Sequence, residues 1–239
     1  MHTKPFRGPW ANSFPNVWIH ADESTVKKHS SYAQAKAGDI GAAVSLVAET
    51  INVEVVRQLE AFGTGKNPVL ISVHAEEAIG VNAIPEVLAD FLAYATNWEL
   101  EELVVQANVV NHTGAGGFAR LSRQAIFEGE IEHGRNYIIV DDFIGQGGTI
   151  ANLRGHILQQ HGIVIGATVL TGKPYSAILA LSTDRLNELR AKHGQIENWW
   201  QRRFGFGFDS LSASEARYLI NTEDTDTIRT RIENADDQA

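Results

Sequence analysis

The residues best suited to chemistry lie in one short stretch, where two adjacent acids precede a glycine-rich bend. Asp141 and Asp142 end a run of β-branched residues, and Thr149 opens a segment with the apolar spacing of a helix. The bend between them holds three glycines, Gly145, Gly147 and Gly148. Glycine allows backbone amides to converge on one point, and the first turn of a helix adds unpaired N–H groups and the positive end of its dipole. The stretch therefore predicts an anion site, to which the Thr149 hydroxyl adds a donor.

The two aspartates require a different partner from the anion, because carboxylates in contact with a phosphate would repel it. We expect Asp141 and Asp142 to accept hydrogen bonds from adjacent sugar hydroxyls, or to bind a divalent cation that bridges the ligand. A phosphate on one side and a diol on the other describes a ribose 5-phosphate. A tight turn with two solvated acids is the alternative interpretation of the same residues.

The stretch resembles the signature of the type I phosphoribosyltransferases, in which apolar residues precede two acids and a loop that ends in Gly-x-Thr. The matching residues run from Ile138 through Asp141 and Asp142 to Thr149. The resemblance covers roughly residues 66–175. It implies that Asp141 and Asp142 bind the ribose hydroxyls of phosphoribosyl pyrophosphate, with Mg²⁺ as cofactor. It also implies that the 5-phosphate is bound by the loop residues Gly145, Gln146, Gly147, Gly148 and Thr149.

Three further landmarks of that family have counterparts by position. The loop after the first core strand binds pyrophosphate in the family, and the residues in that place are His74, Ala75, Glu76 and Glu77. A flexible lid precedes the third strand, and residues 111–123 would be its counterpart, bringing Arg120 and Arg123 onto leaving-group oxygens when it closes. Purine-type members carry Lys-Pro after the fourth strand, so Lys173 is the residue implied to contact the base.

The sequence departs from the family pattern at two places. Purine-type enzymes use an acid at the position of Gly145, and glycine cannot act as acid or base. Glu76 and Glu77 place two carboxylates in the expected pyrophosphate loop, which is unfavourable unless metal neutralises them. Either Mg²⁺ bridges these glutamates, or they point away, or the ligand has no pyrophosphate. In the last case a glutamate could attack the anomeric carbon or activate water.

Alternating strand and helix patterns surround these residues. The predicted strands are residues 68–73, 102–110, 137–141 and 163–171, and the predicted helices between them are residues 83–95 and 149–161. Asn82 is the expected N-cap of the first of these helices, with Pro85 in its first turn. The alternation predicts an α/β fold with a parallel central sheet flanked by helices, which binds ligands beyond the carboxyl ends of its strands.

Helical extensions are expected on both sides of this core, within a single phosphoribosyltransferase-like domain. Residues 1–62 form an N-terminal arm and helical cap, residues 63–175 the α/β core, and residues 176–239 a C-terminal helical extension. The first thirty residues mix prolines with aromatics, a pattern that resists regular structure but favours docking on the body. Trp199 and Trp200 are adjacent and cannot share a helix face, so one of them should pack inward.

Composition limits the classes of partner. The chain has 239 residues, 44% of them apolar, and a formal net charge of -9, which disfavours generic nucleic-acid binding. It has no cysteine, which excludes disulfides and thiolate chemistry. The first ten residues lack the apolar core of a secretion signal, and no segment has the length and apolarity of a membrane span, so we expect a cytoplasmic protein without a membrane partner.

The leading hypothesis is a phosphoribosyltransferase that moves ribose 5-phosphate from phosphoribosyl pyrophosphate to a nitrogen acceptor of unknown identity. One alternative keeps the ribose-phosphate site for a nucleotide glycosidic-bond hydrolase that uses Glu76 or Glu77. Another is a non-catalytic sensor of nucleotide or phosphoribosyl pyrophosphate, whose extensions bind a partner. The family resemblance is also compatible with a homodimer.

Overall fold

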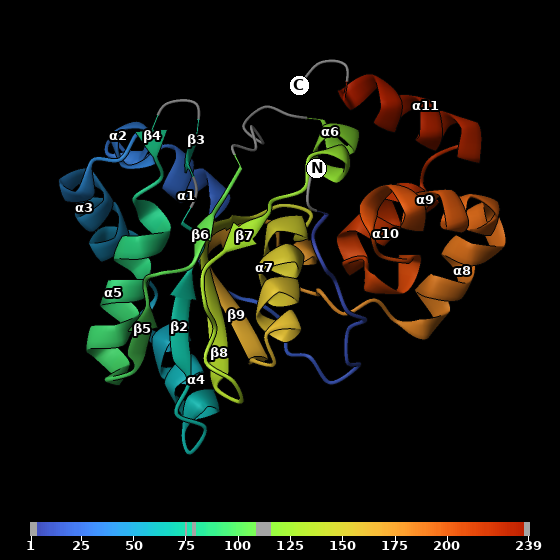
Figure 1. The fold of residues 1–239 in the computed structure, drawn as a ribbon. Helices are drawn as coiled ribbons and strands as arrows, with labels where there is room; N and C mark the ends of the chain where they lie inside the picture. The colour runs from blue at the N-terminus through green and yellow to red at the C-terminus, as the bar shows by residue number, and fades with distance from the viewer. Residues whose placement is uncertain (1–3, 75, 78–79, 109–115, 237–239) are drawn as a thin grey trace.

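A five-stranded parallel sheet forms the centre of the protein (Figure 1). The structure, a computed structural model, describes residues 4–74, 76–77, 80–108 and 116–236. In spatial order the strands are β1 (Trp18–Asp22), β9 (Ile163–Gly172), β8 (Asn136–Ile144), β2 (Val69–Ser72) and β5 (Glu99–Glu101). Each neighbouring pair is parallel. The predicted parallel sheet is therefore confirmed.

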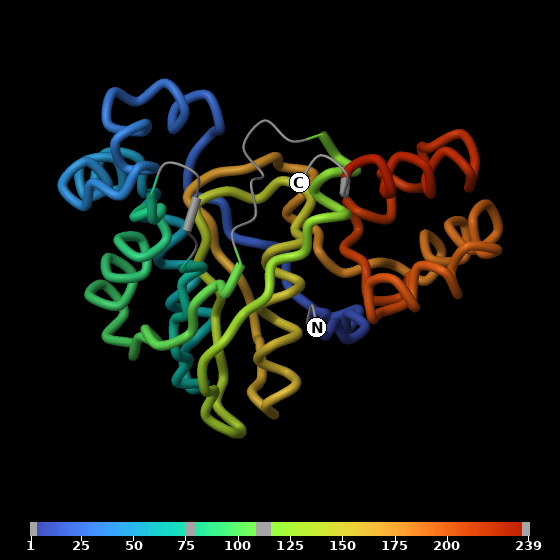
Figure 2. The backbone as a smooth tube through the Cα atoms, turned by 45° about the horizontal axis from the view of Figure 1, so that its top comes forward, coloured from blue at the N-terminus to red at the C-terminus, as the bar shows by residue number. Residues whose placement is uncertain are grey.

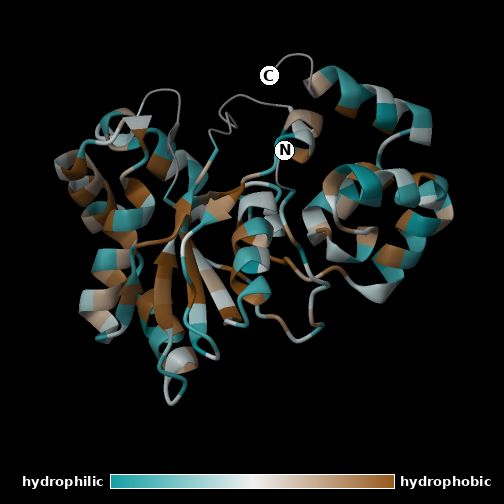
Figure 3. Ribbon diagram, in the orientation of Figure 1, coloured by the Kyte–Doolittle hydropathy of each residue, from teal (hydrophilic) through white to brown (hydrophobic). Residues whose placement is uncertain are grey.

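Both faces of the sheet are buried, as its sequence of β-branched residues requires. Successive side chains of β8 alternate between two separate apolar clusters, with Tyr137 and Ile139 in one and Ile138 and Val140 in the other. Figure 3 shows the same strands as the most hydrophobic part of the ribbon.

Helices cover both faces, as predicted. On one face, apolar side chains come from α3 (Ile40–Thr50), α4 (Val53–Gly63) and α5 (Ile84–Thr96). The opposite face packs against α7 (Gly148–Gln159) and against Trp10 and Val17 of the N-terminal arm. The short helices α1 (Glu23–Lys27) and α2 (Tyr32–Lys36) lead into α3. Asp39 caps α3 by accepting a hydrogen bond from the Ala42 amide at 2.8 Å, which separates α3 from α2.

Two predictions about local structure were wrong. The arm contains β1, which pairs in parallel with β9 at the edge of the sheet. The second core strand is β5, not residues 102–110, of which 109 and 110 lie outside the described residues. Part of that segment, β6 (Val105–Gln106), instead pairs antiparallel with β7 (Phe127–Glu128). β5 was not predicted because Glu99–Glu101 is mostly polar. Edge strands expose one side to water and can therefore carry polar residues.

The helix predicted over residues 83–95 begins at Ile84, with Ala83 at the N-cap position. Asn82 still caps it, because its Oδ1 accepts from the Ile84 amide at 3.2 Å. A second two-stranded sheet, β3 (Glu76–Glu77) with β4 (Gly80–Val81), precedes this helix.

The C-terminal residues form a helical lobe with its own apolar core. Its helices are α8 (Thr183–His193), α9 (Glu197–Phe204), α10 (Ala213–Ile220) and α11 (Thr225–Asp236), with short 3-10 turns at Pro174–Ser176, Gly194–Ile196 and Phe208–Ser210. Trp200 is fully buried in this core, whereas Trp199 is only partly buried, as predicted for adjacent helical residues. Ser212 and Glu215 form a capping box at the start of α10. Among the described residues, no helix has the length and apolarity to span a membrane.

Candidate functional site

The site lies where the order of the strands reverses direction. From β2 the chain proceeds outward to β5, and from β8 it proceeds the other way to β9. The carboxyl ends of β2 and β8 therefore border a crevice, the usual ligand position in open parallel sheets. A cavity of about 210 Å³ lies there. The predicted site residues that line it are Arg120, Arg123, Asp141, Asp142, Gly145, Gln146, Gly147, Gly148 and Thr149.

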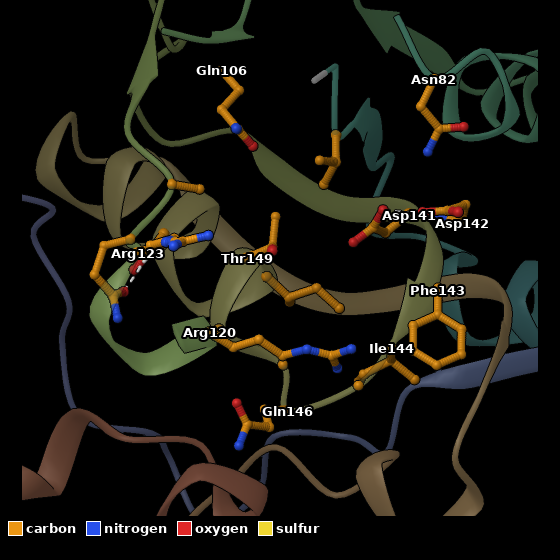
Figure 4. A pocket seen from close by; sticks show the side chains of 18 of the residues that line it. Asn82, Gln106, Arg120, Arg123, Asp141, Asp142, Phe143, Ile144, Gln146 and Thr149 are labelled. Carbon is orange, nitrogen blue, oxygen red and sulfur yellow. Dashed lines mark hydrogen bonds between the residues drawn. The ribbon is translucent and has the colours of Figure 1, made fainter. Parts of the chain in front are cut away.

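The acid pair belongs to the strand itself. We predicted that the strand ends at Asp141, but β8 continues to Ile144, because Phe143 and Ile144 still pair with β9. Successive strand residues point to opposite sides. Asp141 turns toward Thr149 and Asp142 turns away from it (Figure 4), although both line the cavity.

Each carboxylate has a defined partner. Asp142 Oδ2 lies 3.1 Å from Nζ of Lys36 on α2, and both side chains are mostly buried. Asp141 Oδ1 accepts a hydrogen bond from the Asp142 amide at 2.8 Å. Burial raises the pKa of Asp141 well above that of an ordinary aspartate, and the neighbouring Asp142 charge raises it further. The pair therefore combines one carboxylate held by a cation with one that holds a proton more tightly.

The glycine-rich bend has the geometry of an anion cradle. Gly147 adopts a left-handed conformation with φ of 82°, and α7 begins at the next residue. Within the described part of the chain, no residue accepts a hydrogen bond from the backbone amides of residues 145–149. The Gln146 side chain also has a buried Oε1 atom without a described partner. Free amides at the start of a helix form a ready anion site, and the buried Gln146 Oε1 lacks the partner that buried polar atoms normally have.

The predicted lid is largely a helix. Residues 117–122 form α6 (Gly117–Ser122), whose Phe118 and Leu121 are buried in the core of the C-terminal lobe. A segment anchored in this way is not a free loop, so that prediction was wrong for the described residues; residues 111–115 lie outside them. The glycines there gave a loop signal, but the apolar spacing of 118 and 121 fits one helix face.

This anchoring places Arg120 over the bend. Figure 4 shows its guanidinium extended across the cavity above Gln146. A methyl group on Gly145 would lie 2.6 Å from Arg120 Nη1, which shows how closely the two approach. Nε of Arg120 is buried and has no partner among the described residues. The guanidinium of Arg123 reaches the C-terminal lobe, where its Nη2 donates a hydrogen bond to the Ala235 carbonyl at 3.4 Å.

Other predicted site residues lie outside the cavity lining. Lys173 is an exposed side chain that pairs with Glu23, so its contact with a base stays a prediction. The His74 carbonyl accepts a hydrogen bond from the Gln106 amide at 2.9 Å. Ala75 and the side chains of Glu76 and Glu77 lie outside the described residues, so the roles predicted for them stay untested.

Sequence reasoning missed several residues at the site. Lys27, Tyr32 and Lys36 come from the helices before α3, and Asn82 and Gln106 from the segments after β2 and β5. Their local sequence carries no signal, since only the tertiary fold brings α1 and α2 to the carboxyl edge of the sheet. Glu215, which completes the capping box with Ser212, also lines the cavity.

The donor set allows a metal only with help from a ligand. Among the described residues, no group of three His, Cys, Asp or Glu side chains could hold a metal ion. Asp141 and Asp142 supply hard oxygen donors of the kind Mg²⁺ prefers, although Lys36 already pairs with one of them. Oxygens of a bound phosphorylated ligand would have to complete the coordination.

Comparison with known proteins shows two sequence relatives. The chain is 37% identical over 239 residues to Protein TraN of Escherichia coli, which covers the whole chain and 53% of that protein. It is 35% identical over 154 residues to an uncharacterized protein of Haemophilus influenzae, which covers 64% of the chain and 34% of that protein. The chain thus spans about half the length of the first relative and about a third of the second. No protein-family model matches it.

Solved structures of adenine phosphoribosyltransferases overlay on part of the chain. One has a TM-score of 0.34 and 19% identity over 52% of this chain and 74% of its own. The enzyme from Thermoanaerobacter pseudethanolicus has a TM-score of 0.35 and 15% identity, over 54% and 73%. The enzyme from Leishmania donovani has a TM-score of 0.35 and 14% identity, over 70% and 76%. These values are low, and the fold assignment rests on the strand order and pairing described above.

Proposed function

We propose that the protein binds a ribose 5-phosphate group and acts as a phosphoribosyltransferase. It would transfer that group from phosphoribosyl pyrophosphate to a nitrogen acceptor. The observation that carries the proposal is the bend at residues 145–149, whose amides have no acceptor among the described residues and face a cavity lined by two buried aspartates. A phosphate fits the bend, and a diol fits the carboxylates.

Each group at the site has a role in this proposal. The bend amides and the Thr149 hydroxyl bind the 5-phosphate, with positive charge from the start of α7. Asp141 and Asp142 accept hydrogen bonds from the ribose hydroxyls. Arg120 stabilises anionic oxygens above the bend, since a guanidinium forms strong charge-assisted hydrogen bonds with phosphate oxygens.

The reaction forms a bond between the acceptor nitrogen and the anomeric carbon and breaks the bond from that carbon to pyrophosphate. Pyrophosphate leaves with the bonding electron pair, and the nitrogen proton passes to water, because Gly145 supplies no base. Mg²⁺ bound by the pyrophosphate oxygens and the aspartates would supply positive charge beside the leaving group. The protein itself orients the two reactants and stabilises charge with preorganised donors.

Calorimetry with phosphoribosyl pyrophosphate, with and without Mg²⁺, tests the binding step. Pyrophosphate release in the presence of purine and pyrimidine bases tests the transfer. The combined variant Asp141→Asn and Asp142→Asn should abolish turnover while circular dichroism shows an intact fold. Full activity in that variant, or binding of nucleoside monophosphates alone, would contradict the transferase assignment.

One observation favours a second candidate, a hydrolase that cleaves the glycosidic bond of nucleotides. Burial raises the pKa of Asp141, and a raised pKa favours the protonated carboxyl that a general acid requires. Release of a free base from a nucleoside monophosphate, without any requirement for pyrophosphate, would support this candidate. Tight binding without turnover of either substrate would support a sensor.

The compartment and the oligomeric state belong to the same proposal. The protein is expected in the cytoplasm and could form a homodimer. Fractionation and light scattering would test these two expectations.

A further inference from the structure

A guanidinium from the N-terminal arm lies directly behind the glycine-rich bend. Arg7 Nη1 lies 2.7 Å from Glu215 Oε2, and each side chain is only 1% exposed. Arg7 Nη2 lies 3.2 Å from the other oxygen of the same carboxylate. This two-point pairing is the strongest geometry available to an arginine and a carboxylate. Figures 1 and 2 both show the arm running between α7 and the C-terminal helices.

The same guanidinium contacts two other segments. Its Nη2 donates to the Gly148 carbonyl at 3.2 Å, and its Nε donates to Asn152 Oδ1 at 2.5 Å, both on α7. Nη2 also donates to Gln124 Oε1 at 2.8 Å, next to the end of α6. The arm, the first turn of α7, the end of α6 and the start of α10 therefore meet at Arg7.

The contact with Gly148 orients the peptide that faces the cavity. A trans peptide directs its carbonyl and its N–H in opposite directions. Because the Gly148 carbonyl accepts from Arg7 behind the bend, the Thr149 amide N–H points the other way, toward the predicted phosphate position.

The negative charge of Glu215 lies close to the start of α7 and requires a cation beside it if a phosphate is to bind there. A methyl group on Gly148 would lie 2.8 Å from Glu215 Oε1, so the carboxylate reaches the first residue of α7. Glu215 also lines the cavity. A bare carboxylate at this helix end would compete with a phosphate for the same positive potential and repel it.

We propose that Arg7 is a positioning residue for the phosphate subsite, which neutralises Glu215 and fixes the Gly148 peptide so that the bend accepts a phosphate monoester. The inference deepens the proposed function, on which it depends for the identity of the ligand. It makes the N-terminal arm part of the binding site, although Arg7 does not line the cavity.

Three variants separate this electrostatic role from a purely structural one. Arg7→Met removes the cation and leaves Glu215 charged. Glu215→Gln removes the carboxylate, and a glutamine still completes a capping box with Ser212. The double variant removes both charges, which a protein tolerates better than one unpaired buried charge. The probe is ribose 5-phosphate, followed by NMR shifts of the bend amides, with ribose as the uncharged control.

We expect Arg7→Met to weaken ribose 5-phosphate binding at least tenfold, Glu215→Gln to strengthen it because the Arg7 charge is then unopposed, and the double variant to recover most of the loss. Ribose binding should change little in all three. Circular dichroism and thermal melting identify any variant that does not fold, and the double variant then carries the test.

If ribose 5-phosphate binding weakens equally in the two single variants and does not recover in the double variant, the Arg7–Glu215 pair only stabilises the fold. That result would overturn the inference. Absence of ribose 5-phosphate binding in the unaltered protein would overturn it together with the phosphate subsite. If that ligand binds but phosphoribosyl pyrophosphate is not turned over, the inference stands and the transferase proposal fails.

Discussion

Arg120 on α6 lies against Gly145 in the bend after β8, so close that a methyl group on Gly145 would lie 2.6 Å from Arg120 Nη1 and displace it. In the proposed site, the absence of a side chain at Gly145 lets this guanidinium approach the phosphate. We predict that Arg120→Gln weakens ribose 5-phosphate binding roughly thirtyfold, about 2 kcal/mol, because one charge-assisted interaction is lost. Calorimetry measures the change.

Arg123→Gln is the matched control for this variant. Arg123 lies on the same side of the cavity, but its Nη2 donates to the Ala235 carbonyl. We expect a smaller loss of affinity than for Arg120→Gln. An equal loss in both variants would mean that the approach of Arg120 to the bend has no special role.

Gly147→Ala should damage both the fold and the site. The residue has φ of 82°, and an added methyl group would lie 2.5 Å from Leu179 Cδ2. We predict a loss of about 2–4 kcal/mol in the free energy of unfolding, from backbone strain and overpacking together, and loss of phosphate binding. Gly134→Ala is the control, because Gly134 has a similar φ of 77° with nothing within 4 Å. It should lose about 1 kcal/mol and bind normally.

Asp141→Asn should stabilise the free protein while it abolishes ligand binding. The pKa of Asp141 is raised, so the folded protein holds this proton more tightly than the unfolded chain does. The resulting stability is fully present below the ordinary aspartate pKa and is lost as the pH rises through the raised value. Asparagine cannot ionise and avoids that loss. Urea denaturation should show a more stable variant at pH 7 and no difference at strongly acidic pH.

His20 on β1 should produce the opposite pH trend. Its side chain is buried, which lowers its pKa to about 4, with its Nε2 atom 3.2 Å from the Thr168 hydroxyl. The unfolded chain takes up this proton near pH 6.5, so stability falls as the pH drops from there toward 4. We predict that His20 contributes a loss of about 2 kcal/mol between pH 7 and pH 5. Urea denaturation of His20→Gln should lack this contribution, and an unchanged pH profile would contradict it.

Lys36→Met should destabilise the protein at neutral pH. Its ammonium pairs with Asp142 at 3.1 Å in a mostly buried position. Removing one partner of a buried pair leaves an uncompensated charge, at a cost of about 3 kcal/mol. The double variant Lys36→Met and Asp142→Asn should recover much of this loss in thermal melts. No recovery would show that Lys36 acts through other contacts.

Much of the fold followed from local patterns. Apolar runs predicted β2, β8 and β9, and amphipathic spacing predicted α5 and α7. The alternation of these strands and helices predicted a parallel sheet. The short or polar edge strands β1 and β5 were not predicted, because they gain their stability by pairing with a neighbour rather than from their own sequence.

The site likewise contains residues that local patterns predicted and residues that they did not. Asp141, Asp142 and the bend at residues 145–149 are close in sequence, so their proximity follows from a strand, a turn and a helix in succession. Arg120 was predicted as a site residue from its position in the sequence. Its location over the bend depends on the packing of α6 against the C-terminal lobe, which no local pattern predicted.

The sequence by itself therefore determined a parallel α/β core and a glycine-rich bend beside two acids, because both depend on residues that are neighbours in the chain. Only the tertiary structure decided that Lys36 pairs with Asp142 and that Arg7 pairs with Glu215 behind the bend. Those pairs join residues 106 and 208 positions apart. Their geometry depends on the packing of whole helices and of the arm, which no local pattern records.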